Sequence, residues 1–280
     1  MLPHMASDPG QRLALRFAAR SDCGLVRGRN QDCYYTGPKL LALADGMGGM
    51  AAGDVASRMV IDTVKALDAE DFGDELIEAL SGAVNASNDE IRRAVDADPA
   101  LSGMGTTLTA MLFSGFRIGL AHIGDSRAYL LRDGSLRQLT KDDTYVQMLV
   151  DKGAISAEEA AGHPQRSVVT RVLQGKVVDP AYSVHPVQAG DRYLICSDGL
   201  YSVVDAGTIE ATLREHDHPR DCAETLVRLA LDGGGPDNVT VIVADAVPAP
   251  ARRVSPRTVV MLVLLVVALA AFAAGAWLAR

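Results

Sequence analysis

Four aspartates lie at the borders of short apolar runs in this chain. Three of them end such a run and precede a small residue: Asp45, Asp125 and Asp198. The fourth, Asp237, precedes the apolar run 239–244. Carboxylates at the ends of neighbouring strands can converge on one point, where they repel one another unless cations neutralise them. Oxygen ligands of this kind suit Mg²⁺ or Mn²⁺ better than Zn²⁺, although any single aspartate before a small residue is also an ordinary turn residue.

The segments around these aspartates narrow the choice. In chain order they are RGRNQD (27–32), ADGMGG (44–49), GMGTT (103–107), IGDSR (123–127), CSDGL (196–200) and GPDNVT (235–240). This order resembles the PP2C family of metal-dependent Ser/Thr protein phosphatases, and its bacterial branch in particular. Each segment alone is a weak signal, but the ordered set is hard to obtain by chance. The resemblance covers about residues 12–246.

The resemblance implies a fold and a metal site. The fold is α+β, a four-layer α-β-β-α sandwich of two antiparallel sheets flanked by helices, with the site in a cleft at one end. Two Mn²⁺ or Mg²⁺ ions are implied, with a place for a third. By their positions in the motifs, the residues that match the two-ion site are Asp45, which bridges both ions, Gly46 through its carbonyl, Asp198 and Asp237. Asp125 and Asp32 match secondary or third-metal positions.

The resemblance also assigns residues to the substrate. Arg27 matches the arginine that binds the substrate phosphate, a role that suits the planar guanidinium fork. Two divalent ions would activate a water molecule for in-line attack on phosphorus, so Arg27 and Asp45 are the predicted catalytic residues. The stretch 142–171 matches a mobile flap beside the cleft. Its residues His163, Arg166 and Arg171 either contact substrate or are solvated loop residues.

Three positions depart from the family pattern. Met47 stands where some members have a histidine, so this side chain supplies no general acid. Gln31 stands where many relatives have glutamate, which removes a negative charge near Asp32 and predicts weaker binding of one ion. An Asp142-Asp143 pair replaces the Asp-His pair that is frequent at the start of the flap.

Hydrophobic periodicity predicts the elements that position these residues. Alternation and short apolar runs predict strands at 13–17, 39–44, 193–196 and 239–244, and a strand meander over 106–139 with a hairpin turn at Asp133-Gly134. Apolar stripes at helical spacing predict helices over 53–67 and 74–95. A meander of strands with the helices grouped elsewhere favours antiparallel sheets with helices on their outer faces over alternating βαβ units.

Composition limits the classes of function. The 280 residues are 48% hydrophobic, which is enough for a large buried core. A formal charge of −8 argues against nucleic-acid binding, which needs basic surface. The four cysteines show no C-x-x-C spacing and predict reduced thiols in a cytosolic domain rather than a zinc site. No cleavable secretion signal is apparent, and residues 1–11 are predicted to be a disordered tail.

The C-terminal segment predicts a membrane anchor. Residues 258–278 are almost wholly apolar and long enough to cross a bilayer as one helix, with a buried globular helix as the alternative. Three arginines precede the segment within 252–257, whereas only Arg280 follows it, so the domain over 12–246 is predicted to be cytoplasmic, joined by a linker over 247–257. The predicted location is a bacterial cell membrane, with phosphorylated proteins as partners, including a membrane Ser/Thr kinase and its substrates.

Two other functions compete with this interpretation. Cys23 and Arg29 satisfy the C-x5-R spacing of cysteine phosphatases, but the segment lacks the preceding histidine and internal glycine that shape a phosphate loop. Alternatively, the chain is a catalytically weak pseudophosphatase that acts as a membrane-bound binding module. The four predicted metal positions are intact, which argues against the second alternative.

Overall fold

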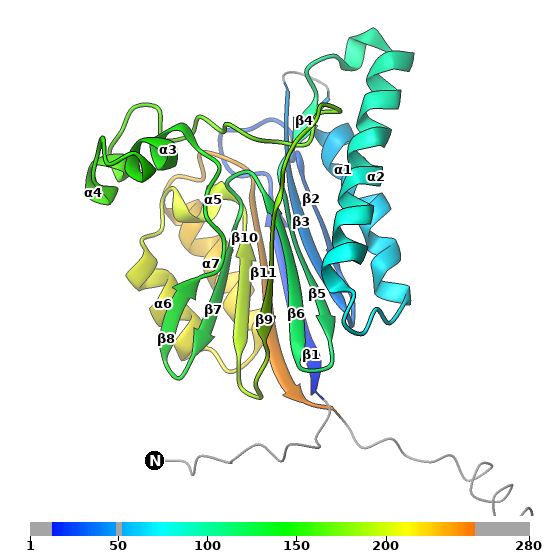
Figure 1. The fold of residues 1–280 in the computed structure, drawn as a ribbon. Coiled ribbons are helices and arrows are strands. Elements are labelled where there is room, and N and C mark those ends of the chain that lie inside the picture. The colour runs from blue at the N-terminus through cyan, green and yellow to red at the C-terminus, as the bar shows by residue number, and fades with distance from the viewer. Residues whose placement is uncertain (1–12, 49–51, 250–280) are drawn as a thin grey trace, which may run out of the picture. The chain divides into compact units, whose positions relative to one another are not determined.

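The computed structural model describes residues 13–48 and 52–249. The strands in this part of the chain are β1 (Leu13–Asp22), β2 (Asp32–Thr36), β3 (Leu40–Met47), β4 (Gly105–Thr106), β5 (Leu108–Ser114), β6 (Arg117–Ile123), β7 (Arg127–Arg132), β8 (Ser135–Gln138), β9 (Ala181–Pro186), β10 (Arg192–Cys196) and β11 (Val239–Pro248). They form two antiparallel sheets (Figure 1). Sheet A has the order β1-β11-β10-β7-β8, and sheet B has the order β2-β3-β5-β6-β9, with β4 paired to β3.

Helices cover the outer faces of both sheets, and two further helices, α3 (Tyr145–Asp151) and α4 (Ala157–Ala161), lie in the segment between β8 and β9 (Figure 1). The other helices are α1 (Gly53–Val64), α2 (Leu76–Ala97), α5 (Asp198–Tyr201), α6 (Ala206–Glu215) and α7 (Pro219–Asp232), with short 3₁₀ helices η1 (Lys65–Ala69) and η2 (Pro99–Leu101). Helices α1 and α2 pack on sheet B, and α5, α6 and α7 pack on sheet A.

The layers follow from alternation within the strands. In β3, Leu40 and Ala42 face the helix layer of α1 and α2, whereas Leu41 and Leu43 lie in the core between the sheets. Because successive side chains of a strand point to opposite faces, a strand covered on both faces is apolar throughout. This explains why β3 is recognisable as a continuous apolar run.

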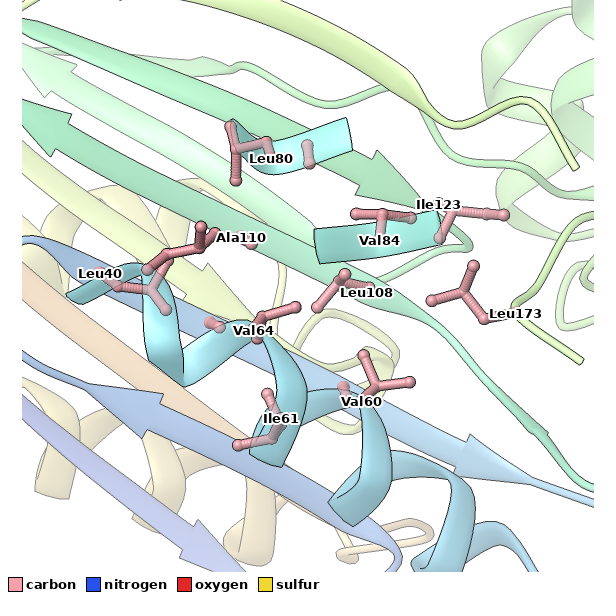
Figure 2. Packing of buried hydrophobic residues seen from close by; sticks show 14 of the residues in the cluster. Leu40, Val60, Ile61, Val64, Leu80, Val84, Leu108, Ala110, Ile123 and Leu173 are labelled. Atoms are coloured by element: carbon pink, nitrogen blue, oxygen red, sulfur yellow. The ribbon is translucent and has the colours of Figure 1, made fainter. Parts of the chain in front are cut away.

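The packing of α1 and α2 on sheet B is shown in Figure 2. Val60 and Val64 from α1 meet Leu80 and Val84 from α2 in one buried cluster over the sheet. A matching cluster joins α6 and α7 to sheet A, and a third lies between the sheets. The predicted α+β sandwich of two antiparallel sheets flanked by helices is therefore confirmed.

The predicted elements agree with the observed ones in type and differ at their ends. The helix predicted over 53–67 is α-helical only to Val64 and continues as the 3₁₀ helix η1. The predicted hairpin turn is present: Asp133 and Gly134 both have positive φ and join β7 to β8. Strands β2 and β9 were not predicted, because β2 is only five residues long and β9 is a half-exposed edge strand with a weak apolar pattern.

The first and last strands of the described residues are neighbours. Leu13 at the start of β1 pairs with Pro248 at the end of β11, and this end of the sandwich lies opposite the loop ends of β3 and β10 (Figure 1). Strand β11 continues two residues past the predicted domain boundary at 246. The tail predicted at 1–11 and the membrane segment predicted at 258–278 lie outside the described residues. Within residues 13–48 and 52–249, no helix is long and apolar enough to cross a membrane.

Candidate functional site

Strands β2 and β3 bring two of the predicted carboxylates together. Asp32 is the first residue of β2 and lies directly opposite Asp45 in the antiparallel register. Asp45 is followed by Gly46, where a side chain has no room. A Cβ at Gly46 would lie 2.1 Å from the carbonyl oxygen of Gly53, the first residue of α1. The close approach of α1 to β3 therefore requires glycine after Asp45.

The other sheet supplies two further carboxylates at the same end of the sandwich. Asp198 follows β10 and opens the short helix α5. Asp237 lies two residues before β11, which is antiparallel to β10 and begins where β10 ends. The end of one strand and the start of its neighbour thus present both side chains at the same end of the strands of sheet A.

These residues line a common cavity of about 870 Å³. Its lining includes the predicted phosphate ligand and five of the six predicted metal residues: Arg27, Asp45, Gly46, Asp125, Asp198 and Asp237. Asp32 is adjacent to this cavity through Asp45, its partner across β2 and β3. The structure therefore brings the predicted site residues together, although they come from segments far apart in the sequence.

Burial and mutual repulsion raise the pKa values of these carboxyl groups, so they give up their protons less readily. Burial, followed by the negative charges of Asp32 and Asp198, raises the pKa of Asp45 well above its usual range. Burial is also the largest cause for Asp198, whose pKa is raised further by Asp125 and Asp237. For Asp125, burial and then the charge of Asp142 raise the pKa to about 6.

Asp32 has one carboxylate oxygen that is fully enclosed. One of its carboxylate oxygens, Oδ1, is buried without a hydrogen-bond partner, while Oδ2 accepts a hydrogen bond of 2.8 Å from the Ser197 hydroxyl. Burial raises the pKa of Asp32 to about 6, against the lowering effect of hydrogen bonds from Thr240 and Ser197. A buried carboxylate oxygen without a donor costs stability unless another group neutralises it.

The arginine side chain at the site lies at the cavity entrance. The Arg27 guanidinium donates a 2.7 Å hydrogen bond to Oδ2 of Asp237, and its side chain is 55% exposed. This hydrogen bond is the largest cause of the raised pKa of Arg27. Arg27 therefore stays charged, is anchored at one nitrogen and is open to solvent.

The donors present fit hard divalent cations. Four aspartates and Gly46 line the cavity, and carboxylate and backbone carbonyl oxygens are the ligands that Mg²⁺ and Mn²⁺ prefer. Over residues 13–48 and 52–249, however, no three His, Cys, Asp or Glu side chains are already close enough to hold one ion. Asp237 is turned toward Arg27, and Mg²⁺ usually keeps several water ligands beside one or two carboxylates. The repelling carboxylates and the unpartnered oxygen of Asp32 are the features that a cation would satisfy.

A second, smaller cavity of about 320 Å³ adjoins the first. Both cavities are lined by Asp125, Asp198 and Ser167. The floor of the smaller one carries Arg127, which donates from two guanidinium nitrogens to the carboxylate of Asp142 at 2.7 to 3.1 Å. The Arg127 guanidinium also lies 3.6 Å from the centre of the Tyr201 ring. This charged group is therefore held rigidly below the predicted flap.

The flap, which contains α3 and α4, is closed at its base by Asp143. The backbone of Asp143 donates a 2.7 Å hydrogen bond to the carbonyl of Gly124, and its Oδ2 accepts one of 3.0 Å from Gly124 N. Its carbonyl accepts hydrogen bonds from the amide and hydroxyl of Thr170, and its Oδ1 pairs with Arg171. Both limbs of the flap are thereby joined next to Asp125.

The three predicted flap residues have different surroundings. Arg166 lines the smaller cavity, whereas His163 and Arg171 are not among the residues lining either of the two cavities described above. His163 instead lies against Tyr145, with ring centres 6.3 Å apart. Arg171 pairs with Asp143 at the base of the flap. Of the three, only Arg166 borders the cavity system in this part of the structure.

Two residues that position the site were not predicted. Asn238 donates to the carbonyls of Cys23 and Arg29, each at 2.9 Å, and accepts from the Gln31 amide at 2.8 Å. Ser197 binds Asp32. Both lie next to a predicted aspartate, but their partners are more than 150 positions away in the sequence, so only their place in the motifs could have marked them.

The cysteine alternative lacks geometric support. Cys23 Sγ donates to the carbonyl of Arg27 at 3.2 Å, and Cys23 is not among the residues that line the larger cavity. Arg29 does line that cavity, together with the aspartates. The Cys23 thiol is engaged with a backbone carbonyl and lies beside an acidic cavity, so the segment does not have the features of a phosphate-binding loop.

Comparison with known proteins agrees with this geometry. The family described as protein phosphatase 2C matches residues 28–241. Serine/threonine protein phosphatase PstP of Mycobacterium tuberculosis H37Rv is 57% identical over 235 residues, which cover 84% of this chain and 46% of PstP. Serine/threonine phosphatase stp of Listeria monocytogenes serovar 1/2a is 35% identical over 237 residues, which cover 81% of this chain and 94% of the relative. The chain spans about half the length of the Mycobacterium protein.

Solved structures give the same result. The crystal structure of the Mycobacterium tuberculosis phosphatase PstP/Ppp has a TM-score of 0.83 and 56% identity, covering 84% of this chain and 100% of that chain. The catalytic domain of PstP in complex with two manganese ions has a TM-score of 0.80 and 54% identity, covering 84% and 99%. Sequence motifs, sheet order, cavity lining and these similarities agree: the chain belongs to the protein phosphatase 2C family.

Proposed function

We propose that this chain is a metal-dependent phosphatase that removes phosphate from phosphoserine and phosphothreonine in proteins. The observation that carries the proposal is the cavity at one end of the sandwich, where buried, mutually repelling aspartates lie beside an exposed arginine. Carboxylates in this state favour divalent cations, and an arginine at the entrance favours a phosphate. The names of the related proteins, which are Ser/Thr phosphatases, support the same activity.

Asp45, the Gly46 carbonyl, Asp198 and Asp237 would hold two Mn²⁺ or Mg²⁺ ions, and Asp125 a third. The donor chemistry supports this, as does the related catalytic domain that was solved with two manganese ions. Bound there, the ions would activate water for in-line attack on phosphorus and offset negative charge in the transition state.

The protein's own side chains would fix the substrate and the ligands. Arg27 has its guanidinium at the cavity entrance, and its planar fork would bind two phosphate oxygens. Its contact with Asp237 at 2.7 Å couples the phosphate site to a metal ligand. Asp32 lies opposite Asp45 in the sheet and would orient the Asp45 carboxylate as a metal ligand.

We further propose that the chain is anchored in the membrane by residues 258–278, with the phosphatase domain on the cytoplasmic side. The support is the apolar sequence of that segment and the arginines before it. Confinement to a membrane would raise the effective concentration of membrane-bound substrates, among them a Ser/Thr kinase and its targets.

The activity is tested by phosphate release from a phosphothreonine peptide with and without Mn²⁺. We expect Asp198→Asn and Asp237→Asn to lose at least about 100-fold in kcat/KM, because each removes a charged ligand from the metal site. Asp133→Asn is the matched control, since Asp133 lies in the β7–β8 turn and asparagine accepts the same positive φ. Full activity in both site variants would contradict the metal mechanism. Mn²⁺ binding without any phosphate release would favour a non-enzymatic binding module.

A further inference from the structure

Two large apolar side chains stand in water immediately before Arg27. Leu25 is 68% exposed and Val26 is 71% exposed. Leucine and valine are usually buried, and isolated exceptions occur on every protein surface. Here the two exceptions are adjacent, and the next residue is the arginine at the cavity entrance.

The turn that carries them is held firmly by the loop before β11. The Leu25 amide donates a 2.8 Å hydrogen bond to the carbonyl of Gly235. On either side of the pair, Asn238 donates to the carbonyls of Cys23 and Arg29 at 2.9 Å. Because the backbone is already ordered, a ligand that covers Leu25 and Val26 would not have to order this turn.

Leu231, which is partly buried against the helix-covered core of sheet A, lies on the other side of that contact. A Cβ at Gly235 would lie 3.0 Å from Cγ of Leu25 and 3.2 Å from Cδ2 of Leu231, so both leucines approach the same glycine. We call Leu25, Val26 and Leu231 the apolar shelf. Leu25 and Val26 directly precede Arg27, and Leu231 precedes the loop that carries Asp237. Arg27 and Asp237 pair with each other at 2.7 Å. The shelf therefore adjoins the phosphate-binding arginine.

We propose that the apolar shelf binds an apolar side chain of the phosphoprotein substrate, at a position within about two residues of the phosphorylated serine or threonine. This inference rests on the proposed function. Leu25 is two residues from Arg27, a span of at most about 7 Å along the chain. A substrate whose phosphate lies on Arg27 would place its flanking residues over the same distance. An apolar flanking side chain would be removed from water when it packs on the shelf, which favours binding. A polar side chain would gain no free energy there.

The test uses two phosphothreonine peptides that differ only at the flanking positions, one with leucine and valine and the other with serine. We expect the unmodified full chain with Mn²⁺ to prefer the apolar peptide by about tenfold in kcat/KM. In the double variant Leu25→Ser/Val26→Ser the preference should fall to about one. Val177→Ser is the matched control, because Val177 is fully exposed and is not among the residues lining the larger cavity. This variant should still prefer the apolar peptide by about tenfold in kcat/KM.

The outcomes separate the inference from the proposed function. Hydrolysis of para-nitrophenyl phosphate, which has no flanking residue, reports whether the cleft is intact in the double variant. Equal rates on both peptides with the unmodified chain would overturn the inference alone. An equal loss on all three substrates in the double variant would overturn it as well, because the turn would then only support the cleft. If the unmodified chain releases phosphate from none of them, the proposed function itself is contradicted.

Discussion

At the scale of single residues, the site stores electrostatic repulsion. Asp32 and Asp45 face each other across β2 and β3, and the buried Oδ1 of Asp32 has no donor. Without a bound cation, such an unpartnered buried carboxylate oxygen lowers the free energy of unfolding. A cation removes the penalty, so binding and stability are linked at this position.

This linkage gives the metal-free protein an unusual pH dependence. The pKa of Asp32 is about 6 in the folded chain and 3.8 for an unperturbed aspartate, so the folded chain binds a proton that the unfolded chain releases. The contribution to stability is full below the lower value and is lost as the pH rises through the higher one. We expect Asp32 to lower the free energy of unfolding by about 1.4 kcal/mol between about pH 5 and pH 7.5.

Urea unfolding of the chelator-treated protein at the two pH values measures this change. Asp32→Asn is the matched variant and should lose the part of the pH dependence that Asp32 contributes, because the pKa values of Asp45, Asp125 and Asp198 are raised as well. Asp133→Asn in the β7–β8 turn should keep all of the pH dependence. Saturating Mn²⁺ should reverse the trend, because the ion binds the deprotonated carboxylates. An Asp32→Asn protein with the pH dependence of the unmodified chain would show that other groups cause it.

At the scale of elements, the flap is coupled to the metal site through one side chain. Asp143 is only 4% exposed and binds Gly124, the residue before Asp125, while it pairs with Arg171 on the returning limb. Asparagine at 143 would keep hydrogen-bonding groups but lose the charge that Arg171 requires. The flap is therefore expected to open more often without changes in the sheets.

Amide hydrogen exchange over residues 144–169 tests this coupling. In Asp143→Asn we expect exchange there to rise about tenfold, the equivalent of about 1.4 kcal/mol for a charge-assisted hydrogen bond. Asp151→Asn is the control within the flap, because Asp151 forms an exposed pair with Lys141, which contributes little. Equal exchange in the two variants would refute a special role for Asp143.

Elements differ in how far the sequence determines them. The apolar runs of β3 and β10 and the stripes of α1 and α2 were predicted because burial acts on many consecutive residues. The edge strand β9 and the four-residue helix α5 were not predicted, since their conformation depends on neighbours. The aspartates were predicted from their motifs, but the contacts of Asn238 were not, because its partners come from the turn at residues 23–31.

At the scale of the whole molecule, the site joins the two sheets. Sheet B contributes Asp45 and Gly46, and the segments that follow β10 and precede β11 in sheet A contribute Asp198 and Asp237. Ions held by both groups would tie the layers together at the end where the apolar core between them stops. At the opposite end, Leu13 at the start of β1 pairs with Pro248 at the end of β11.

The extent of β11 predicts where the domain can be shortened. A chain that ends after Pro248 keeps all the pairs between β1 and β11, so its melting temperature and Mn²⁺-dependent activity should match those of the full chain. Ending after Ala246 removes the pairs of Leu13 and Ala14 and should lower the free energy of unfolding by about 1 kcal/mol.

Both shortened chains also test the membrane anchor, because they lack residues 258–278 and should leave the membrane fraction of cells. Persistence of the fragments at the membrane would contradict the anchor at 258–278.

The pairing of β1 with β11 also constrains how the protein is made. On the ribosome, β1 is among the first strands to emerge, yet its only neighbour in sheet A is the last strand of the domain. Until then β1 is an open edge that can associate with other nascent chains. The aspartates of sheet B likewise wait for those of sheet A, so a complete ion site first exists when translation of the domain is nearly finished. Pairing of β1 and completion of the ion site therefore both depend on synthesis of β10 and β11.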